Sequence, residues 1–207
     1  MIKTSIIVPV FNEEGIIEKT IDSLKKYLSQ ECEIIAVNDG STDRTRELLE
    51  KILDIKVINH LVNRGYGAAL KSGIQKSQGD HILIIDADGT YPAESIPELI
   101  KYKDDFDMVV GARINPQSKI PISRKPTKWF LNKLASYLTS TKIPDLNSGL
   151  RIIKKDILMK FFHLLPDGFS FTTTITLAAL TSGYSVKYIP IDYSKRVGKS
   201  KIRPIRD

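Results

Sequence analysis

The sequence has very little cysteine and histidine and no long apolar run, and each shortage excludes a class of protein. A single cysteine, Cys32, rules out an intramolecular disulfide and favours a reducing compartment. The three histidines do not have the spacing of a zinc site, so we expect core or surface roles for them. No stretch reaches the ~18 apolar residues of a membrane span, and no secretory leader follows Met1. We therefore expect residues 1–207 not to cross a bilayer.

Charge is divided unevenly along the 207 residues. Residues 1–112 contain 13 Lys and Arg against 19 Asp and Glu, whereas residues 113–207 contain 18 against 5, and the net charge is +7. A basic second half suggests an anionic partner. Nucleic acid, an acidic membrane surface and a phosphorylated substrate all satisfy that condition, so charge alone does not choose among them.

Short β-branched runs alternate with helical patterns, which predicts βαβ units and a mostly parallel sheet in one α/β domain spanning residues 1–207. We expect strands at 5–9, 33–37, 56–59, 81–85 and 107–111, and two more near 150–153 and 186–191. Helices are expected at 13–28, after 43, at 68–76, from 92, around 128–138 and at 170–180. The run 81–85 is apolar throughout, which predicts a central strand buried on both faces.

Asp86-Ala87-Asp88 directly follows this central strand. Ligands bind at the carboxyl ends of strands in open α/β sheets, and two carboxylates there are costly unless a cation joins them. Oxygen ligands supplied by few protein groups suit Mg²⁺ or Mn²⁺ bridging substrate phosphates. The motif therefore predicts a divalent metal held by Asp86 and Asp88.

Three other polar segments follow strands in the same way. Asn38-Asp39-Gly40-Ser-Thr-Asp43 offers acceptors for a base or ribose, and it also fits a simple helix cap. Pro9-Val-Phe11-Asn-Glu13 ends the first strand. Asn63-Arg-Gly65-Tyr-Gly-Ala-Ala-Leu-Lys71 enters a helix, and helix N-termini of this kind attract phosphate.

Together these segments resemble the family 2 inverting glycosyltransferases, which have the GT-A fold with a Rossmann-like central sheet. The resemblance covers essentially the whole chain. It implies that Pro9, Glu13 and Asp39 hold the nucleoside of a donor sugar nucleotide, that Lys71 lies near the diphosphate, and that Asp86 and Asp88 handle the metal. It also implies a wider donor site that includes Phe11, Asn63, Gly65 and Ala87.

The second half is similar to the dolichyl- or polyprenyl-phosphate sugar synthases of that family. The similarity rests on the segments 88–92, 110–113, 145–151 and 196–201. Thr90 stands where the mannosyl enzymes often have a glutamine that assists the metal. This difference counts against a third protein ligand for the metal and against GDP-mannose as the donor. The Gln-x-x-Arg-Trp signature of processive synthases is absent. Many members carry membrane helices beyond this region, so the chain fits a catalytic domain on the cytoplasmic face of a membrane.

The chemistry of the acceptor decides which residues are needed. A sugar hydroxyl would need a general base, and Asp145 is the candidate, with a structural role equally open. A lipid monophosphate is mostly dianionic at neutral pH and needs cations instead. We assign Asp88, Asp145, Arg113 and Arg151 to catalysis, and Arg124, Arg196, Lys199 and Lys201 to the acceptor phosphate.

Several alternatives remain at this stage. A nucleotidyltransferase should open with a glycine-rich basic loop, which the acidic 9–14 loop is not. A nucleic-acid-binding module does not explain the paired aspartates, and we expect no nucleic-acid partner. A family 2 enzyme acting on a soluble glycan or polysaccharide is the main competitor. UDP-glucose, UDP-N-acetylglucosamine and GDP-mannose stay open as donors, and the sequence favours UDP slightly.

Overall fold

The computed structural model describes residues 1–115, 133, 135–137, 139 and 141–194. Their first half contains β1 (Thr4–Val10), α1 (Ile17–Tyr27), β2 (Cys32–Asn38), α2 (Thr45–Lys51), β3 (Lys56–Asn59), α3 (Tyr66–Lys76), β4 (His81–Ile84), the 3-10 turn η1 (Ala93–Ser95) and α4 (Ile96–Lys101). Their second half contains β5 (Met108–Ala112), β6 (Arg151–Lys154), α6 (Lys155–Phe161), η3 (Phe162–Leu164), α7 (Phe171–Thr181) and β7 (Val186–Pro190).

The strands of the described residues form one seven-stranded sheet in the order β3-β2-β1-β4-β6-β5-β7. Strands β1 to β4 are parallel, and β7 is parallel to β5, which confirms the mostly parallel sheet. Strand β6 is the exception, because it runs antiparallel to both β4 and β5. The chain leaves β5 and returns at the same edge of the sheet, so the next strand must run in the opposite direction.

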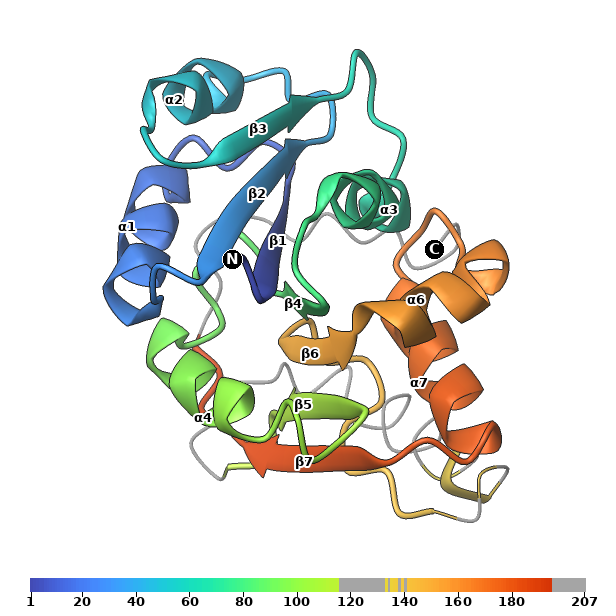
Figure 1. The fold of residues 1–207 in the computed structure, drawn as a ribbon. Coiled ribbons are helices and arrows are strands. Elements are labelled where there is room, and N and C mark those ends of the chain that lie inside the picture. Colours follow the sequence, from blue (N-terminus) through green and yellow to red (C-terminus); the bar gives the residue numbers. More distant parts are fainter. Residues whose placement is uncertain (116–132, 134, 138, 140, 195–207) are drawn as a thin grey trace.

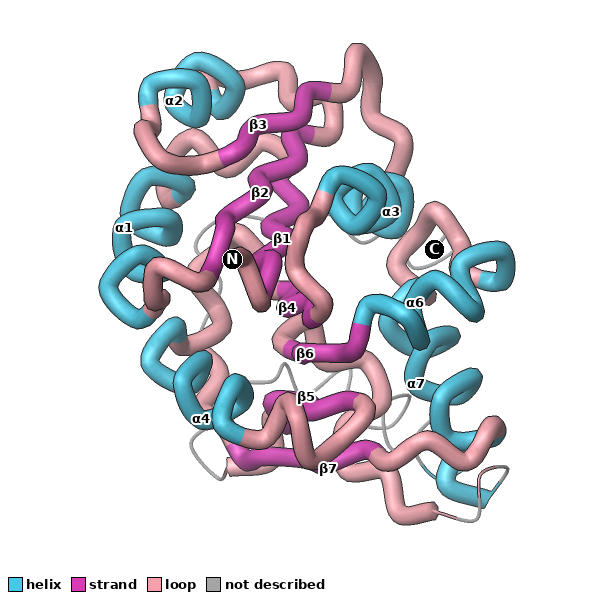
Figure 2. The backbone as a smooth tube through the Cα atoms, viewed as in Figure 1, coloured by secondary structure: helices cyan, strands magenta, loops and turns pink. Residues whose placement is uncertain are grey.

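Two helical layers cover the sheet, and each has its own apolar core (Figures 1 and 2). Helices α1, α2 and α4 pack on one face with side chains such as Ile21, Leu49 and Leu99. Helices α3, α6 and α7 pack on the other face. Strand β4 lies between the two cores, with Leu83 in the first and Ile84 in the second. The prediction of a central strand buried on both faces is confirmed.

The structure differs from the expected elements at the first helix and at α6. The first helix starts at Ile17 and not at residue 13, because Asn12 has a φ of +52° and the next residues form a turn closed on the Glu13 carbonyl. Helix α6 was not expected, since its seven residues are too few to show a helical period and no capping segment like the one before α2 precedes it. The expected helix around 128–138 falls mostly outside the described residues. None of the helices in the described part of the chain is both long and apolar enough to span a membrane.

Candidate functional site

The four polar segments that follow β1 to β4 meet at one edge of the sheet, because parallel strands end on the same side. The Asp39 N–H donates to the Val10 carbonyl over 2.8 Å, and the His60 N–H donates to the Asn38 carbonyl over 2.9 Å. Adjacent loops are thus fixed to one another by backbone hydrogen bonds. The sequence prediction of a shared edge is realised in the structure.

The two predicted metal ligands follow β4 and have different surroundings. Asp86 is partly exposed, and its Oδ1 accepts a 2.9 Å hydrogen bond from the Tyr66 hydroxyl. Asp88 is buried, and its Oδ1 accepts hydrogen bonds from the Thr90 N–H (3.1 Å) and the Thr90 Oγ1 (2.6 Å). Burial, followed by the charge of Asp86, raises the pKa of the Tyr66 phenol well above its usual value. Tyr66 therefore stays a hydrogen-bond donor to the Asp86 carboxylate.

Gly149 lies against the Asp86 carboxylate. A methyl group at Gly149 would meet the Asp86 oxygens and Cγ at 2.4 to 2.8 Å, so an alanine cannot fit unless Asp86 moves. The Gly149 N–H donates to the Tyr91 hydroxyl over 2.6 Å, and this hydrogen bond fixes the backbone of the glycine. Neither Gly149 nor Tyr91 was singled out from the sequence, although both lie within segments that carry the family resemblance.

These groups fit a divalent cation of the magnesium type. Within the described residues, no group of three or more His, Cys, Asp and Glu side chains is arranged to hold a metal. Mg²⁺ characteristically binds one or two protein carboxylates and takes its other ligands from water and substrate phosphates. Asp86 and Asp88 supply that number of carboxylates. The Thr90 hydroxyl donates to Asp88 and fixes the orientation of this carboxylate.

Asp39 is buried at the end of β2, and its carboxylate organises the loop between β3 and α3. Its Oδ1 accepts from His60 Nδ1 (2.7 Å) and the Arg64 N–H (2.9 Å), and its Oδ2 accepts from the Gly65 N–H (2.8 Å). The Asn63 amide donates to the Asp39 carbonyl over 3.2 Å. Sequence reasoning missed His60, whose only signal is its position directly after a strand.

The other predicted donor residues lie around the same edge. Pro9 and Phe11 are partly exposed, while Glu13 is buried and its N–H donates to the Thr45 hydroxyl over 2.8 Å. Ala87 is buried, and its carbonyl accepts from the Thr20 hydroxyl. Lys71 forms a 2.8 Å ion pair with Asp167, a partner that the sequence did not suggest.

Arg113 and Asp145 form a paired unit at the end of β5. The Arg113 Nε and Nη2 donate to the two oxygens of the fully buried Asp145 over 2.7 and 2.9 Å, and Nη2 also donates to Asn147. Burial alone would lower the pKa of the Arg113 guanidinium, but the nearby Tyr91 hydroxyl and Asp145 raise it above its usual range. A carboxylate bound on both oxygens is better suited to position a cation than to act as a base.

Arg151 is fully buried, and its described hydrogen bonds run to backbone carbonyls, one hydroxyl and the Met108 sulfur. Its guanidinium donates to the carbonyls of Ser148 and Thr172 and to the Thr176 hydroxyl. Burial lowers its pKa from the usual arginine value. The structure thus places Arg151 between α7 and the 145–149 loop, where it binds the carbonyls of Leu146 and Ser148, the neighbours of Asp145 and Gly149 in the sequence.

The predicted acceptor residues Arg124, Arg196, Lys199 and Lys201 lie outside the described residues. The last described residue, Ser194, donates its N–H to the Thr90 carbonyl over 3.0 Å. Tyr193 lies under the Arg113 guanidinium, 5.2 Å from ring centre to Cζ. The chain that leads into the basic run is therefore attached to the loop of Asp88.

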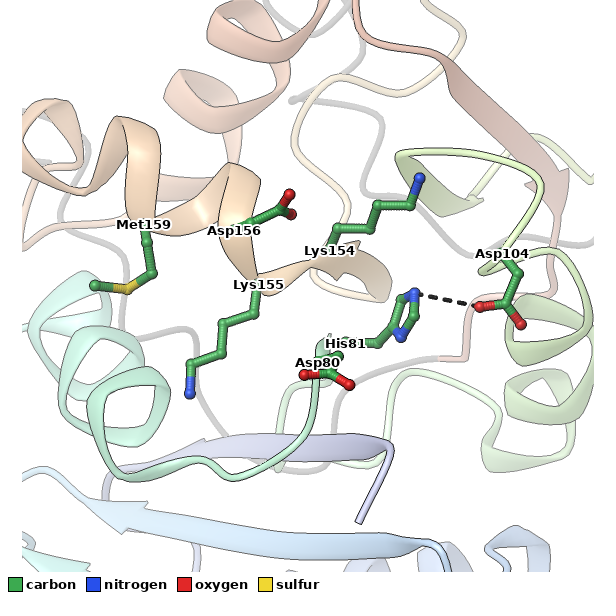
Figure 3. Close-up of a pocket in the computed structure, with 7 residues that line it drawn as sticks. All are labelled: Asp80, His81, Asp104, Lys154, Lys155, Asp156 and Met159. Atoms are coloured by element: carbon green, nitrogen blue, oxygen red, sulfur yellow. Dashed lines mark ion pairs between the residues drawn. The ribbon is translucent and has the colours of Figure 1, made fainter. Parts of the chain in front are cut away.

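A separate hollow of about 490 Å³ lies at the opposite edge of the sheet (Figure 3). His81, at the start of β4, faces Asp104 across 3.6 Å, and burial lowers its pKa. The Lys154 ammonium pairs with Asp107, and the Lys155 ammonium donates to the Ser77 carbonyl. Asp86 and Asp88 follow β4 at the carboxyl ends of the parallel strands, where open α/β sheets bind ligands, so we place the candidate site there and not at this hollow.

Solved structures identify the fold. Glucosyl-3-phosphoglycerate synthase from Mycobacterium tuberculosis, solved with Mg²⁺ and UDP, matches with a TM-score of 0.74 over 98% of this chain and 73% of that chain, at 20% identity. The fold is that of the GT-A glycosyltransferases.

Sequence comparisons assign the family. The model of glycosyl transferase family 2 matches residues 5–162, and the chain belongs to that family of enzymes. The undecaprenyl-phosphate 4-deoxy-4-formamido-L-arabinose transferase of Yersinia pestis is 31% identical over 99% of this chain and 64% of its own length. The prophage bactoprenol glucosyl transferase homolog of Escherichia coli is 34% identical over 80% and 56%. The chain thus spans between half and two thirds of the length of these relatives.

Proposed function

We propose that residues 1–207 form a metal-dependent catalytic domain that transfers a sugar from a nucleoside diphosphate to a polyprenyl phosphate, with inversion. The observation that carries this proposal is that two groups lie at the same edge of the sheet. They are the carboxylates of Asp86 and Asp88, and the Arg113 guanidinium held by Asp145. The names of the relatives support a polyprenyl phosphate acceptor. The structural neighbour with UDP supports a nucleotide donor, and we favour UDP.

In the proposed reaction, the acceptor phosphate oxygen forms a bond to the anomeric carbon from the face opposite the diphosphate. The bond from that carbon to the diphosphate oxygen breaks, and the departing nucleoside diphosphate takes the electron pair. When bound at Asp86 and Asp88, Mg²⁺ or Mn²⁺ would neutralise this diphosphate. Arg113, held by Asp145, supplies a fixed positive charge that needs no rearrangement during the reaction.

A phosphate acceptor agrees with the state of Asp145. A dianionic phosphate needs no proton removed, whereas a hydroxyl acceptor needs an accessible general base. Asp145 is fully buried and bound to Arg113 through both oxygens. We therefore propose that Asp145 positions Arg113. Because the acceptor lipid resides in a bilayer, we further propose that the domain works at the cytoplasmic face of a membrane.

The direct experiment measures transfer of radiolabelled sugar from UDP-glucose, UDP-N-acetylglucosamine and GDP-mannose into organic-extractable product. Undecaprenyl phosphate is the acceptor, and Mn²⁺ is included or replaced by EDTA. We expect metal-dependent product from one donor. Product that forms only with a soluble glycan would move the enzyme to the hydroxyl-acceptor class, and full activity in EDTA would remove the metal from the proposal.

We expect Asp39→Ala to raise the KM for the donor by about 10- to 100-fold, because donor binding weakens, and to change kcat only a few-fold. The variant leaves the Arg64 and Gly65 N–H groups and His60 without their acceptor, so the donor loop loses its shape. Initial rates over a donor series and calorimetric titration with UDP measure the two parameters. Asp22→Ala, on the exposed side of α1, is the control. A large fall in kcat with unchanged UDP affinity would place Asp39 in the chemical step instead.

We expect the double variant Lys199→Ala, Lys201→Ala to reduce transfer to polyprenyl phosphate far more than the slow hydrolysis of the donor by water. The 195–203 run lies outside the described residues, and its basic sequence predicts a clamp that lowers the repulsion between the donor diphosphate and the lipid phosphate. The control is Lys26→Ala, Lys51→Ala. It removes the same amount of charge from two exposed lysines that are far from this run in the sequence. Equal losses of both activities, or none, would contradict the clamp.

A further inference from the structure

Two neighbouring aliphatic side chains are fully presented to solvent in the loop between β3 and α3. Leu61 is 97% exposed and Val62 is 66% exposed. Figure 1 shows this loop extending away from the end of β3 before the chain turns into α3. Apolar residues exposed singly are common on proteins, whereas contiguous exposed apolar surface often marks an interaction site, which makes this adjacent pair a candidate.

The loop that carries this pair is fixed and does not depend on the pair for its shape. Its flanks are tied to Asp39 through the N–H groups of Arg64 and Gly65 and through the His60 ring. Beneath it, Gly40 has a φ of +68°, and a methyl group there would meet the Val62 carbonyl carbon at 2.4 Å. The backbone of the loop is thus held by contacts that do not involve the Leu61 and Val62 side chains.

The pair lies at the edge of the sheet that carries the active site. The loop follows β3, and Asp86 follows β4, which runs in the same direction. A further exposed apolar side chain, Ile114, comes just after β5, whose carboxyl end lies at the same edge. In the order of the sheet, β3 and β5 lie on either side of β4, so exposed apolar groups follow strands on both sides of the strand that leads to Asp86.

We propose that Leu61 and Val62 insert into the interfacial region of a lipid bilayer and bring the active-site edge to the lipid phosphate. This inference rests on the proposed polyprenyl phosphate acceptor. Two side chains cover far less than the ~800 Å² per partner that a stable protein interface buries, which argues against a second copy of the chain as the occupant. Arg64 is exposed beside the pair, and its charge complements anionic headgroups.

The test compares Leu61→Ser, Val62→Ser with the matched control Leu53→Ser. Leu53 is 77% exposed but precedes β3, and so lies at the opposite edge. Flotation with phosphatidylcholine–phosphatidylglycerol vesicles should show about a 10- to 100-fold weaker partition of the double variant, with the control unchanged. UDP affinity should stay at the wild-type value, because neither side chain is assigned to the donor site.

A second measurement separates this inference from the proposed function. The double variant should lose transfer to undecaprenyl phosphate in vesicles but keep transfer to a short, water-soluble prenyl phosphate. Equal vesicle binding by wild type and double variant, an equal loss in Leu53→Ser, or a wild-type dimer dissociated by the double change would each overturn the insertion. If the wild type transfers no sugar to any prenyl phosphate, the proposed function itself fails.

Discussion

Asp88→Asn should abolish sugar transfer, with a loss of at least about 10³-fold in kcat, while the fold stays intact. The substitution removes one charge from a site that must balance a departing diphosphate, a contribution of several kcal/mol. The turn itself should survive, because an asparagine Oδ1 can still accept from the Thr90 N–H and hydroxyl. Transfer rates over a Mg²⁺ series and thermal unfolding measure the two effects.

The matched control for this change is Asp105→Asn. Asp105 is an exposed aspartate after α4, and the same loss of charge there should leave the rate unchanged. If Asp88→Asn keeps most of the wild-type rate at saturating Mg²⁺, Asp88 is not a metal ligand. A large fall in the melting temperature would instead show that the hydrogen bonds from Thr90 to the buried Asp88 carboxylate contribute mainly to folding.

Gly149→Ala should reduce kcat by about 100-fold, although it adds a single methyl group. That methyl would lie 2.4 Å from an Asp86 oxygen, so the carboxylate must shift by a substantial fraction of an ångström. Displacements of about 1 Å in a catalytic arrangement cost on the order of 10²-fold in rate. We expect weaker Mn²⁺ binding, measured by electron paramagnetic resonance, together with the loss of turnover.

Gly168→Ala provides the comparison, because a methyl group there meets nothing within 4 Å. It should bind Mn²⁺ and turn over as the wild type does. Overpacking at Gly149 should also destabilise the protein by about 1–3 kcal/mol. A fully active Gly149→Ala enzyme would show that the position of Asp86 against Gly149 is irrelevant to the metal.

Most helices and strands could be predicted from the sequence, because short β-branched runs alternate with helical patterns. The 56–59 strand agrees with β3 residue for residue, and the apolar run from His81 gives β4. The short helix α6 and the direction of β6 could not be predicted. A seven-residue helix shows less than two full periods, and strand direction depends on where the chain returns to the sheet.

The candidate site could likewise be predicted from the sequence only in part. The Asp86-Ala87-Asp88 motif was evident because two carboxylates after a buried strand are unusual in any setting. The burial of Arg151 was not evident, since an isolated arginine in a sequence is more often at the surface than inside. Its partners Ser148 and Thr172 come from two different segments, and only packing brings those segments together.

The sequence by itself determined the family, the order of the strands and of most helices, and the edge at which the strand-end loops gather. Those features follow from local patterns, since apolar period and turn residues act over a few positions. The tertiary structure alone decided that Asp39 holds the loop of His60 and Gly65, that Asp145 holds Arg113, and that Gly149 touches Asp86. These contacts join residues more than 20 positions apart, and their distances are set by how the two helical layers pack on the sheet.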